Sequence, residues 1–458
     1  MKASGWSGAT ATAPADAALA LRHAWLASGG EEDALERVTF TGPADVVPSA
    51  FPVTAVASGV IAAATLAAAM PDRPVIVDRT HAVVSCRSER YLEVEQLPAA
   101  GSGLVGGDLR TADGWIRIHV LYPHHRAAAR QVLGGVRGHD AFTAAVADRR
   151  AEELQEAIVV AGAAAARLRT ADEWAAHPHG ARVRELPLLS VERVEDGPAR
   201  GSDRFRVLDL TRVIAGPTAS KILAAHGAEV LRVEAPGFPE SPVLTIDTGF
   251  GKRVTTLDLR SREDGDTLEH LIRDADVVVH GFRPGALEGL GFGEQRMAEL
   301  RPGLVLASLS AWGEVGPWAG RRGFDSLVQM ASGIAATGRD AAGTDQPVPL
   351  PMQLLDHGTA WLLALGVLQA RRRRRELGGT WRVSAALART GAWLQDLHPG
   401  PGLGVGDIAT TEVEPYLDAV DSAWGRLRFV RPPGLIDGRG ASWSKPPEPP
   451  GTSRPVWA

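Results

Sequence analysis

The chain has 458 residues, which is long enough for two domains that each bury a core of their own. Hydrophobic residues make up 45% of the composition, which indicates a folded, globular protein rather than a disordered one. The formal net charge of -5 excludes a strongly basic surface for nucleic acid or an anionic membrane.

The first two hundred residues are predicted to mix helices and strands. An Ala-rich segment, "AVASGVIAAATLAAAMPD", is predicted to be helical, and strands are predicted in "PVIVDRTHAVVS" and "DGWIRIHVLYPHHR". Two helical segments in "HDAFTAAVADRRAEELQEAIVVAGAAAARLR" and a helix in "TADEWAAHP" come next. The polar stretch "VERVEDGPARGSD" then breaks the periodicity with Pro198 and Gly201. We place a domain boundary there, between residues 1–200 and 201–398.

After the boundary, apolar strands alternate with helices. The strands are expected in "RFRVLDLTRV", "AEVLRVEAPG", "DADVVVHGF" and "GLVLASLSAWG", with a helix in "GPTASKILAAHG". This alternation predicts an α/β fold with a parallel sheet, and ligands of such sheets lie beyond the carboxyl ends of the strands. Three loops therefore qualify for a site: "TRVIAGP", "HGFRPGALEGLGF" and "SAWGEVGPWAGRRGFD".

Beyond Gly378 the text "TWRVSAALARTGAWLQDL" predicts a strand that leads into a helix. The segment 399–458 is rich in Gly and Pro, and we expect it to form a tail that loops over the surface. The single cysteine, Cys86, excludes an internal disulfide framework. The sequence shows no secretory signal and no apolar run of membrane-spanning length, so we expect a cytoplasmic location and no membrane partner.

Most motifs that reveal chemistry are absent from this sequence. It has no Walker loop, no G-x-S-x-G elbow, and no dinucleotide-binding glycines after a strand. The pairs His124 with His125 and His177 with His179 raise the alternative of a metal site, but partner ligands at suitable spacing are missing, and we predict no metal.

One carboxylate stands out. The stretch "PLPMQLLDHGTAWLLALGVLQA" has the pattern of a buried helix, yet its first turn carries Asp356, followed by His357. One interpretation is a helix cap, since a carboxylate at this end accepts free backbone N–H groups. The other is a nucleophilic carboxylate, kept ionised by the same N–H groups and facing an incoming acyl group. The two interpretations are compatible.

Five segments, in order, resemble the family III CoA-transferases. They are "RVLDLTRVIAGPTASKILAAHGAEVLRVEAPG", "LDL", "DADVVVHGFRPGALEGLGFG", "RPGLVLASLSAWGEVGPWAGRRGFDSLVQMASGI" and "PVPLPMQLLDHGTAWLLALGVL". That family includes formyl-CoA transferase, carnitine CoA-transferase and the related alpha-methylacyl-CoA racemases. The resemblance implies a Rossmann-like large domain, a smaller α+β domain and an interlocked homodimer.

The resemblance also implies a chemistry. Asp356 matches the aspartate that attacks the acyl-CoA thioester, forms a mixed anhydride and then an aspartyl-CoA thioester, and passes CoA to an acceptor carboxylic acid. Coenzyme A is then a substrate, and no tightly bound cofactor is implied. The implied CoA contacts are Val213, Ile214, Ala215, Leu257, Phe282, Ala286 and Arg322, the last of them for a phosphate.

Three positions depart from the family's pattern and bear on the alternatives. Gly281 replaces the first residue of the usual "NFRPG", and Ser310 stands where formyl-CoA transferase has a lysine. Phe324 stands where the racemases have a histidine, and racemisation needs an acid and a base on opposite faces of the α carbon. An acyl-CoA racemase or isomerase is therefore the disfavoured alternative, and a non-catalytic acyl-CoA-binding protein is another.

Residues 1–200 resemble the half that usually follows the catalytic segment, as if the two halves were exchanged or partly duplicated. This half would supply the small domain and the cover over the site. We interpret its polar residues Asp113, His119 and His125 as structural.

Overall fold

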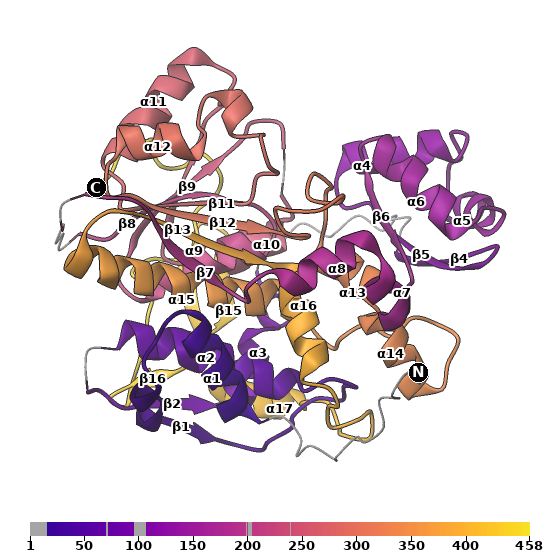
Figure 1. Cartoon of the computed structure of the whole chain (residues 1–458), viewed down its shortest axis with the longest axis horizontal. Helices are drawn as coiled ribbons and strands as arrows, with labels where there is room; N and C mark the ends of the chain where they lie inside the picture. The colour runs from indigo at the N-terminus through magenta and orange to yellow at the C-terminus, as the bar shows by residue number, and fades with distance from the viewer. Residues whose placement is uncertain (1–15, 70–71, 96–106, 198, 200–203, 239) are drawn as a thin grey trace, which may run out of the picture.

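The computed structural model describes residues 16–69, 72–95, 107–197, 199, 204–238 and 240–458. A seven-stranded sheet runs through its centre (Figure 1). Six strands are parallel in the spatial order β10-β9-β8-β11-β12-β13, and β7 is antiparallel at the edge. The strands are β7 Ser190–Glu195, β8 Arg206–Leu210, β9 Glu229–Glu234, β10 Lys252–Thr256, β11 Val277–His280, β12 Val305–Ser310 and β13 Thr380–Ala386.

The central strands are apolar on both faces because helices cover both faces. In β8, Val207 belongs to one core cluster, while Leu208 and Leu210 belong to another on the opposite face. Every residue of β8 is buried, as expected for a strand inside a parallel sheet. The predicted α/β class with a parallel sheet is confirmed.

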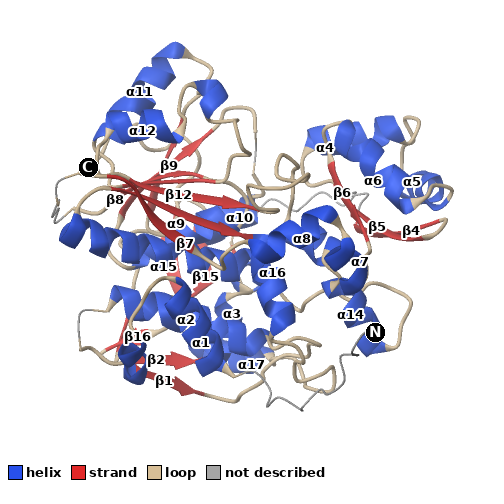
Figure 2. Cartoon of the chain, in the orientation of Figure 1, coloured by secondary structure: helices blue, strands red, loops and turns tan. Residues whose placement is uncertain are grey.

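Helices pack on each face of the sheet (Figure 2). On one face lie α11 and α12, and on the other α9 and the long α15. The bounds are α9 Ala215–Ala225, α11 Arg262–Arg273, α12 Glu294–Leu300 and α15 Leu354–Leu377. Shorter helices complete this part: α10 Pro242–Thr248, η3 Glu288–Leu290, α13 Asp325–Ala331, α14 Ile334–Ala342 and α16 Leu387–Asp396.

The basic run Arg371 to Arg375 lies in the last turns of α15. Arg374 forms a buried ion pair with Asp276 at 2.9 Å, and Arg373 donates to the carbonyl of Ser28 at 2.7 Å. The helix ends at Gly378, whose φ of +69° is a conformation that glycine adopts without strain. These arginines therefore serve the packing of the helix.

A small lobe with its own core lies to one side of the sheet (Figure 1). Residues 107–167, hereafter the small lobe, form a three-stranded antiparallel sheet and three helices. Ile116, Phe142 and Leu154 are among its buried residues. The elements are β4 Gly107–Thr111, β5 Gly114–His119, α4 Pro123–Val132, α5 His139–Ala147, α6 Ala151–Val160 and β6 Ala164–Arg167. Helices α7 Ala171–Ala176 and α8 Pro178–Glu185 lead back to β7.

The N-terminal residues form a layer against α15. The stretch "PVIVDRTHAVVS", predicted as a strand, is a strand only to Asp78 and then a helix, because the Asp78 carboxylate accepts the His81 N–H at 2.9 Å and caps it. Its elements are α1 Ala17–Ala27, η1 Glu32–Arg37, β1 Val38–Thr41, α2 Val53–Ala68, β2 Val75–Asp78, α3 Arg79–Ser85, η2 Ser88–Arg90 and β3 Glu93–Val94.

The prediction that the tail only loops over the surface is wrong. Strand β15 pairs with β14 and with β3, and β16 pairs with β2, so the tail completes two sheets begun by the N-terminal layer. Leu427, Phe429 and Val430 are buried there. The elements are α17 Thr410–Val413, η4 Glu414–Tyr416, β14 Leu417–Ser422, β15 Gly425–Val430, β16 Leu435–Ile436 and β17 Arg439–Gly440.

The predicted division at residue 201 stays a prediction. Pro198 and residues 200–203 lie outside the described residues. Just before them, β7 pairs with β13 and extends the large sheet. None of the helices that the structure describes is both long and apolar enough to cross a membrane.

Candidate active site

The candidate site lies at the carboxyl ends of the parallel strands. The strand order reverses direction between β8 and β11, and the loops after these two strands diverge there, which leaves a crevice for a ligand. Two adjoining cavities of about 190 and 320 Å³ fill this crevice. Hereafter they are the groove, and both are lined by Arg212, Val213, Phe282, Ser310 and Phe324.

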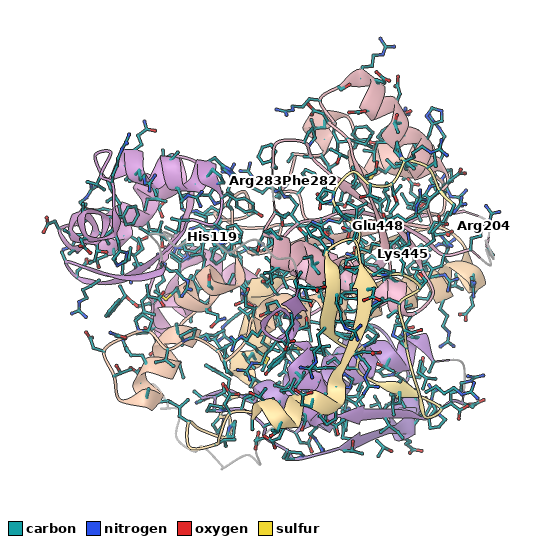
Figure 3. All side chains as sticks on the ribbon, turned by 180° about the vertical axis from the view of Figure 1, so that it is seen from behind. His119, Arg204, Phe282, Arg283, Lys445 and Glu448 are labelled. Atoms are coloured by element: carbon teal, nitrogen blue, oxygen red, sulfur yellow. The ribbon has the colours of Figure 1, made fainter. Side chains whose placement is uncertain are left out.

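The three predicted loops meet in the groove. Val213 follows β8, Phe282 follows β11, and Ser310 ends β12. In Figure 3, Phe282 and Arg283 lie between the small lobe, which carries His119, and the helices α11 and α12. The small lobe contributes Tyr122, His124 and His125 to the larger cavity.

Most of the residues implied for CoA surround the groove. Ala215 lines the smaller cavity together with Asp356, while Ala286 and Arg322 line the larger one. Leu257 lines a further small cavity, of about 50 Å³, which also contains Phe282. Ile214 instead is buried as the N-cap residue of α9 and is not among the residues that line these cavities.

Asp356 is the third residue of α15 and is only 7% exposed. The N-cap residue is Gln353, so Asp356 is in the first turn but is not the cap. Burial raises the pKa of Asp356 well above its ordinary value, and the nearby carboxylates of Asp325 and Glu89 raise it further. Desolvation and the two like charges thus oppose the ionised form of Asp356 that the helix N–H groups were expected to favour.

The two neighbouring carboxylates come from distant parts of the chain. Asp325, the first residue of α13, is 1% exposed and accepts the Asp356 N–H at 2.9 Å. Glu89 comes from the N-terminal layer, and its carboxylate lies 3.5 Å from the Nε2 atom of His357. The sequence analysis did not identify either residue, because nothing in the local sequence around them indicates that they lie near Asp356.

Aromatic rings of the small lobe and of Phe324 form a wall beside the smaller cavity, which Asp356 lines. The ring of Phe324 stacks on that of His119 with centroids 3.4 Å apart and planes at 4°. Burial lowers the pKa of His119 to about 3 and that of His125 to about 4, so both imidazoles are neutral at physiological pH. Asp113 accepts the Ala151 N–H at the start of α6 at 2.8 Å, as its structural interpretation requires.

Several arginines give the larger cavity a positive character. Arg212 pairs with Glu240 at 2.7 Å, and Arg321 pairs with Glu156 at 2.8 Å. Arg322, in contrast, has no ion-pair partner within the part of the chain that the structure describes. An arginine left unpaired at the edge of an apolar groove is suited to a phosphate.

The departures from the family pattern have local explanations. The Ser310 hydroxyl accepts the Gly313 N–H at 2.9 Å and so stabilises the turn after β12. Among the described residues, a Cβ atom at Gly281 would meet Leu309 at 3.8 Å, which is ordinary van der Waals contact, so this position could hold a larger residue.

The histidines considered for a metal have other partners. His179 faces the Trp312 carbonyl at 3.0 Å and accepts the Trp318 N–H at 3.2 Å, and His177 accepts the His179 N–H. Over the described ranges, no group of three or more His, Cys, Asp or Glu side chains is placed to hold a metal ion.

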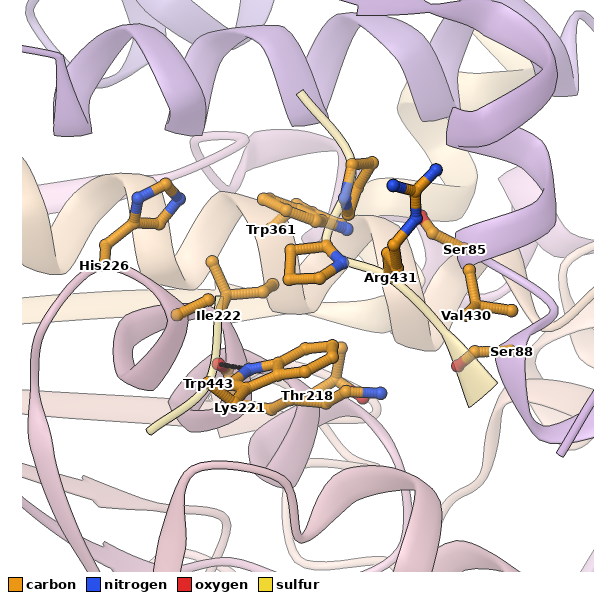
Figure 4. A pocket seen from close by; sticks show the side chains of 13 residues that line it. Ser85, Ser88, Thr218, Lys221, Ile222, His226, Trp361, Val430, Arg431 and Trp443 are labelled. Carbon is orange, nitrogen blue, oxygen red and sulfur yellow. Dashed lines mark hydrogen bonds between the residues drawn. The ribbon is translucent and has the colours of Figure 1, made fainter. Parts of the chain in front are cut away.

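Another cavity lies away from the groove, between α9, α15 and the tail (Figure 4). Trp361, Arg431 and Trp443 line it, and the Trp443 indole donates to the Lys221 carbonyl at 3.0 Å. Its volume of about 30 Å³ suits a single water molecule rather than a substrate.

Comparison with known proteins finds relatives of the part of the chain that follows the small lobe. Residues 203–413 match the family described as CoA-transferase family III. A probable fatty acyl-CoA transferase of Mycobacterium tuberculosis is 35% identical over 211 residues, which cover 43% of this chain and 53% of that protein. Formyl-CoA:oxalate CoA-transferase of Rhodopseudomonas palustris is 34% identical over 197 residues, which cover 40% of this chain and 46% of that protein.

A crystal structure of a hypothetical protein from Mycobacterium tuberculosis is 33% identical, covers 44% of this chain and 59% of its own, and has a TM-score of 0.38. The chain thus spans about half the length of the two curated relatives named above. The match begins just before β8, the first parallel strand of the large sheet, and includes the loops of the groove after β8, β11 and β12. The part of the chain from residue 203 to residue 413 is therefore similar to CoA-transferase family III.

Proposed function

We propose that this protein is a CoA-transferase that moves CoA from an acyl-CoA thioester to a carboxylic acid, with Asp356 as the nucleophile. The observation that carries the proposal is a buried carboxyl group, Asp356, in the wall of the groove at the strand-order reversal, within the segment that matches the family. A carboxylate with a raised pKa is a stronger nucleophile in its ionised form than an ordinary aspartate.

The proposed reaction proceeds through two kinds of covalent intermediate. The Asp356 carboxylate attacks the thioester carbonyl, the C–S bond breaks, and CoA thiolate leaves a mixed anhydride. The thiolate then attacks the Asp356 carbonyl and releases the donor acid, which gives an aspartyl-CoA thioester. The acceptor carboxylate attacks that thioester to form a second anhydride, and CoA thiolate attacks its acyl carbon, which restores Asp356. In each step one bond to an acyl carbon forms as another breaks, so no free carboxylic acid has to be activated separately.

The surroundings of the groove support the proposed mode of CoA binding. Val213, Ala215 and Phe282 offer apolar contacts for the pantetheine and adenine parts, and Arg322 offers a cation for a phosphate. The order of the six parallel strands is that of a Rossmann-like sheet, which supports the same placement. The interlocked homodimer and the cytoplasmic location rest on the family resemblance and the sequence, and both stay predictions; sedimentation velocity would measure the former.

The proposed nucleophile predicts a pH dependence. Only ionised Asp356 attacks, so transfer should fall as the pH drops through its pKa, and burial, Asp325 and Glu89 place that fall at a higher pH than for an ordinary aspartate. Glu89→Gln removes one of the two like charges and should move the acid limb of the kcat/KM profile to lower pH. The exposed Glu93, which pairs with Arg428, provides a matched control, because Glu93→Gln should leave the profile in place. An unmoved or upward-moved limb in Glu89→Gln would contradict this account.

Intact-protein mass spectrometry tests the function directly. The protein is mixed with a panel of acyl-CoAs, with and without hydroxylamine, beside the Asp356→Ala variant. A CoA adduct that hydroxylamine removes and the variant lacks establishes the aspartyl thioester and identifies the donor. If no donor gives an adduct while CoA still binds, the transferase proposal fails. Exchange of the α-carbon hydrogen for deuterium would then indicate a racemase, and no exchange would indicate a binding protein.

A further inference from the structure

Val213 has a backbone conformation that its side chain disfavours. Its φ is +70°, in the left-handed region, where a β-branched residue is a true outlier. The residue lies in the turn between β8 and α9 and lines both cavities of the groove. Strained residues of this kind persist only where their surroundings hold them, and they gather at functional sites.

A single carboxylate holds this turn. The Val213 N–H donates to Oε2 of Glu240 at 2.8 Å. The other oxygen, Oε1, accepts from Nε of Arg212 at 3.1 Å and from its Nη2 at 2.7 Å. The Glu240 side chain is only 5% exposed. Burial alone would raise the pKa of Glu240, but the Tyr122 hydroxyl, Arg212 and the Val213 N–H together hold it below its ordinary value, so the carboxylate is ionised.

The same carboxylate reaches the small lobe. The Tyr122 hydroxyl donates to Oε1 of Glu240 at 2.5 Å, and Tyr122 is 7% exposed at the start of α4. The Arg212 guanidinium lies over the Tyr122 ring, 5.3 Å from its centroid. Tyr122 lies outside the segment that matches the family, whereas Glu240 and Val213 lie inside it. Glu240 thus joins the two walls of the groove, as the Arg321–Glu156 ion pair and the His119–Phe324 ring stack also do.

We propose that Glu240 is a positioning residue that keeps the Val213 backbone in its left-handed conformation and, through Tyr122, sets the small lobe against the groove. Glu240 acts through the backbone of the turn rather than through the reacting atoms. The proposal deepens the function argued above, because it makes CoA affinity depend on this carboxylate. The contacts of Glu240 with Val213, Arg212 and Tyr122, hereafter the latch, can nevertheless be measured without any ligand.

Hydrogen–deuterium exchange of the full chain measures the latch. Glu240→Ala should speed exchange in the peptides 208–216 and 114–126, because the Val213 N–H loses its acceptor and the small lobe loses its anchor. Tyr122→Phe should speed exchange in 114–126 with little effect on 208–216. Tyr416→Phe is a matched control, since Tyr416 also donates to a carboxylate, that of Asp78 at 3.0 Å, but lies in the tail and should leave both peptides unchanged. Unchanged exchange in Glu240→Ala would overturn the proposal.

A double-variant cycle with CoA as the probe separates positioning from mere stability. Glu240→Ala should weaken CoA binding, measured by calorimetry, by about tenfold. Glycine adopts a positive φ without strain, so in a Val213→Gly background the same Glu240→Ala change should have little further effect. An equal loss in both backgrounds would contradict the positioning role. If the unaltered protein does not bind CoA, the proposed function fails, while the exchange experiment still decides the latch.

Discussion

Asp356→Asn should abolish CoA transfer, with kcat/KM lowered by roughly 10⁴-fold or more, as for other enzymes that lose a covalent nucleophile. The amide has nearly the same size as the carboxylate, so the packing of α15 should survive. The amide cannot, however, form the anhydride, and among the residues that the structure describes no other carboxyl lines the smaller cavity. The substitution also removes a carboxyl that is costly to bury, so the variant should be at least as stable as the parent. Initial rates with the donor identified by mass spectrometry provide the measurement.

Asp247 provides a matched control for this substitution. It is buried like Asp356 and interacts with the Ser88 hydroxyl at 2.9 Å and with Lys221 at 3.3 Å, but it does not line the groove. Asp247→Asn should therefore keep transfer activity near that of the parent, and Asp356→Asn should still bind CoA. A variant at position 356 that transfers CoA at a tenth of the parental rate would show that Asp356 is not the nucleophile.

Lys252→Met should be among the most destabilising single substitutions in the large sheet. The Lys252 ammonium lies 3.0 Å from the Asp209 carboxylate, and both side chains are fully buried. Burial lowers the pKa of Lys252 to about 8, so the pair is still ionised at neutral pH. Removing the cation leaves Asp209 as an unpaired buried charge, which typically costs about 3–5 kcal/mol. Urea denaturation followed by circular dichroism measures the loss.

The loss should depend on the pairing of the charges. Adding Asp209→Asn to Lys252→Met removes the orphaned charge and should recover much of the stability, while the Asn side chain can still accept the Thr211 N–H. Lys445→Met is the control, because Lys445 pairs with Glu448 near the surface and should cost less than about 1 kcal/mol. A Lys252→Met variant as stable as Lys445→Met would refute the importance of the buried pair.

The secondary-structure elements that follow from the local sequence could be predicted. Strands β8, β11 and β12 are mainly apolar and mainly buried, and the loops after them were expected to form a site. Strand β10 was not predicted, because it begins with Lys252 and Arg253 and lacks an apolar run. The burial of Lys252 becomes possible only when Asp209 of a different strand faces it.

The candidate site, too, could be predicted only where the local sequence determines it. The place of Asp356 in the first turn of a buried helix follows from the pattern around it, and the structure brings Val213, Phe282 and Arg322 to the same groove. Its electrostatics could not be predicted, because Asp325 and Glu89 approach Asp356 through tertiary packing. Tyr122 and Glu240 were missed for the same reason, since 118 positions separate them in the chain.

The pairing of the tail with the N-terminal layer has a consequence for biosynthesis. Strand β2 is translated before the large sheet, yet its neighbour β16 at Leu435–Ile436 is translated only after β13, the last strand of that sheet in the chain. The edge of β2 that pairs with β16 therefore stays unpaired while the large sheet is synthesised. We expect nascent chains stalled before residue 430 to be bound by chaperones and cleaved readily by proteases within residues 38–94.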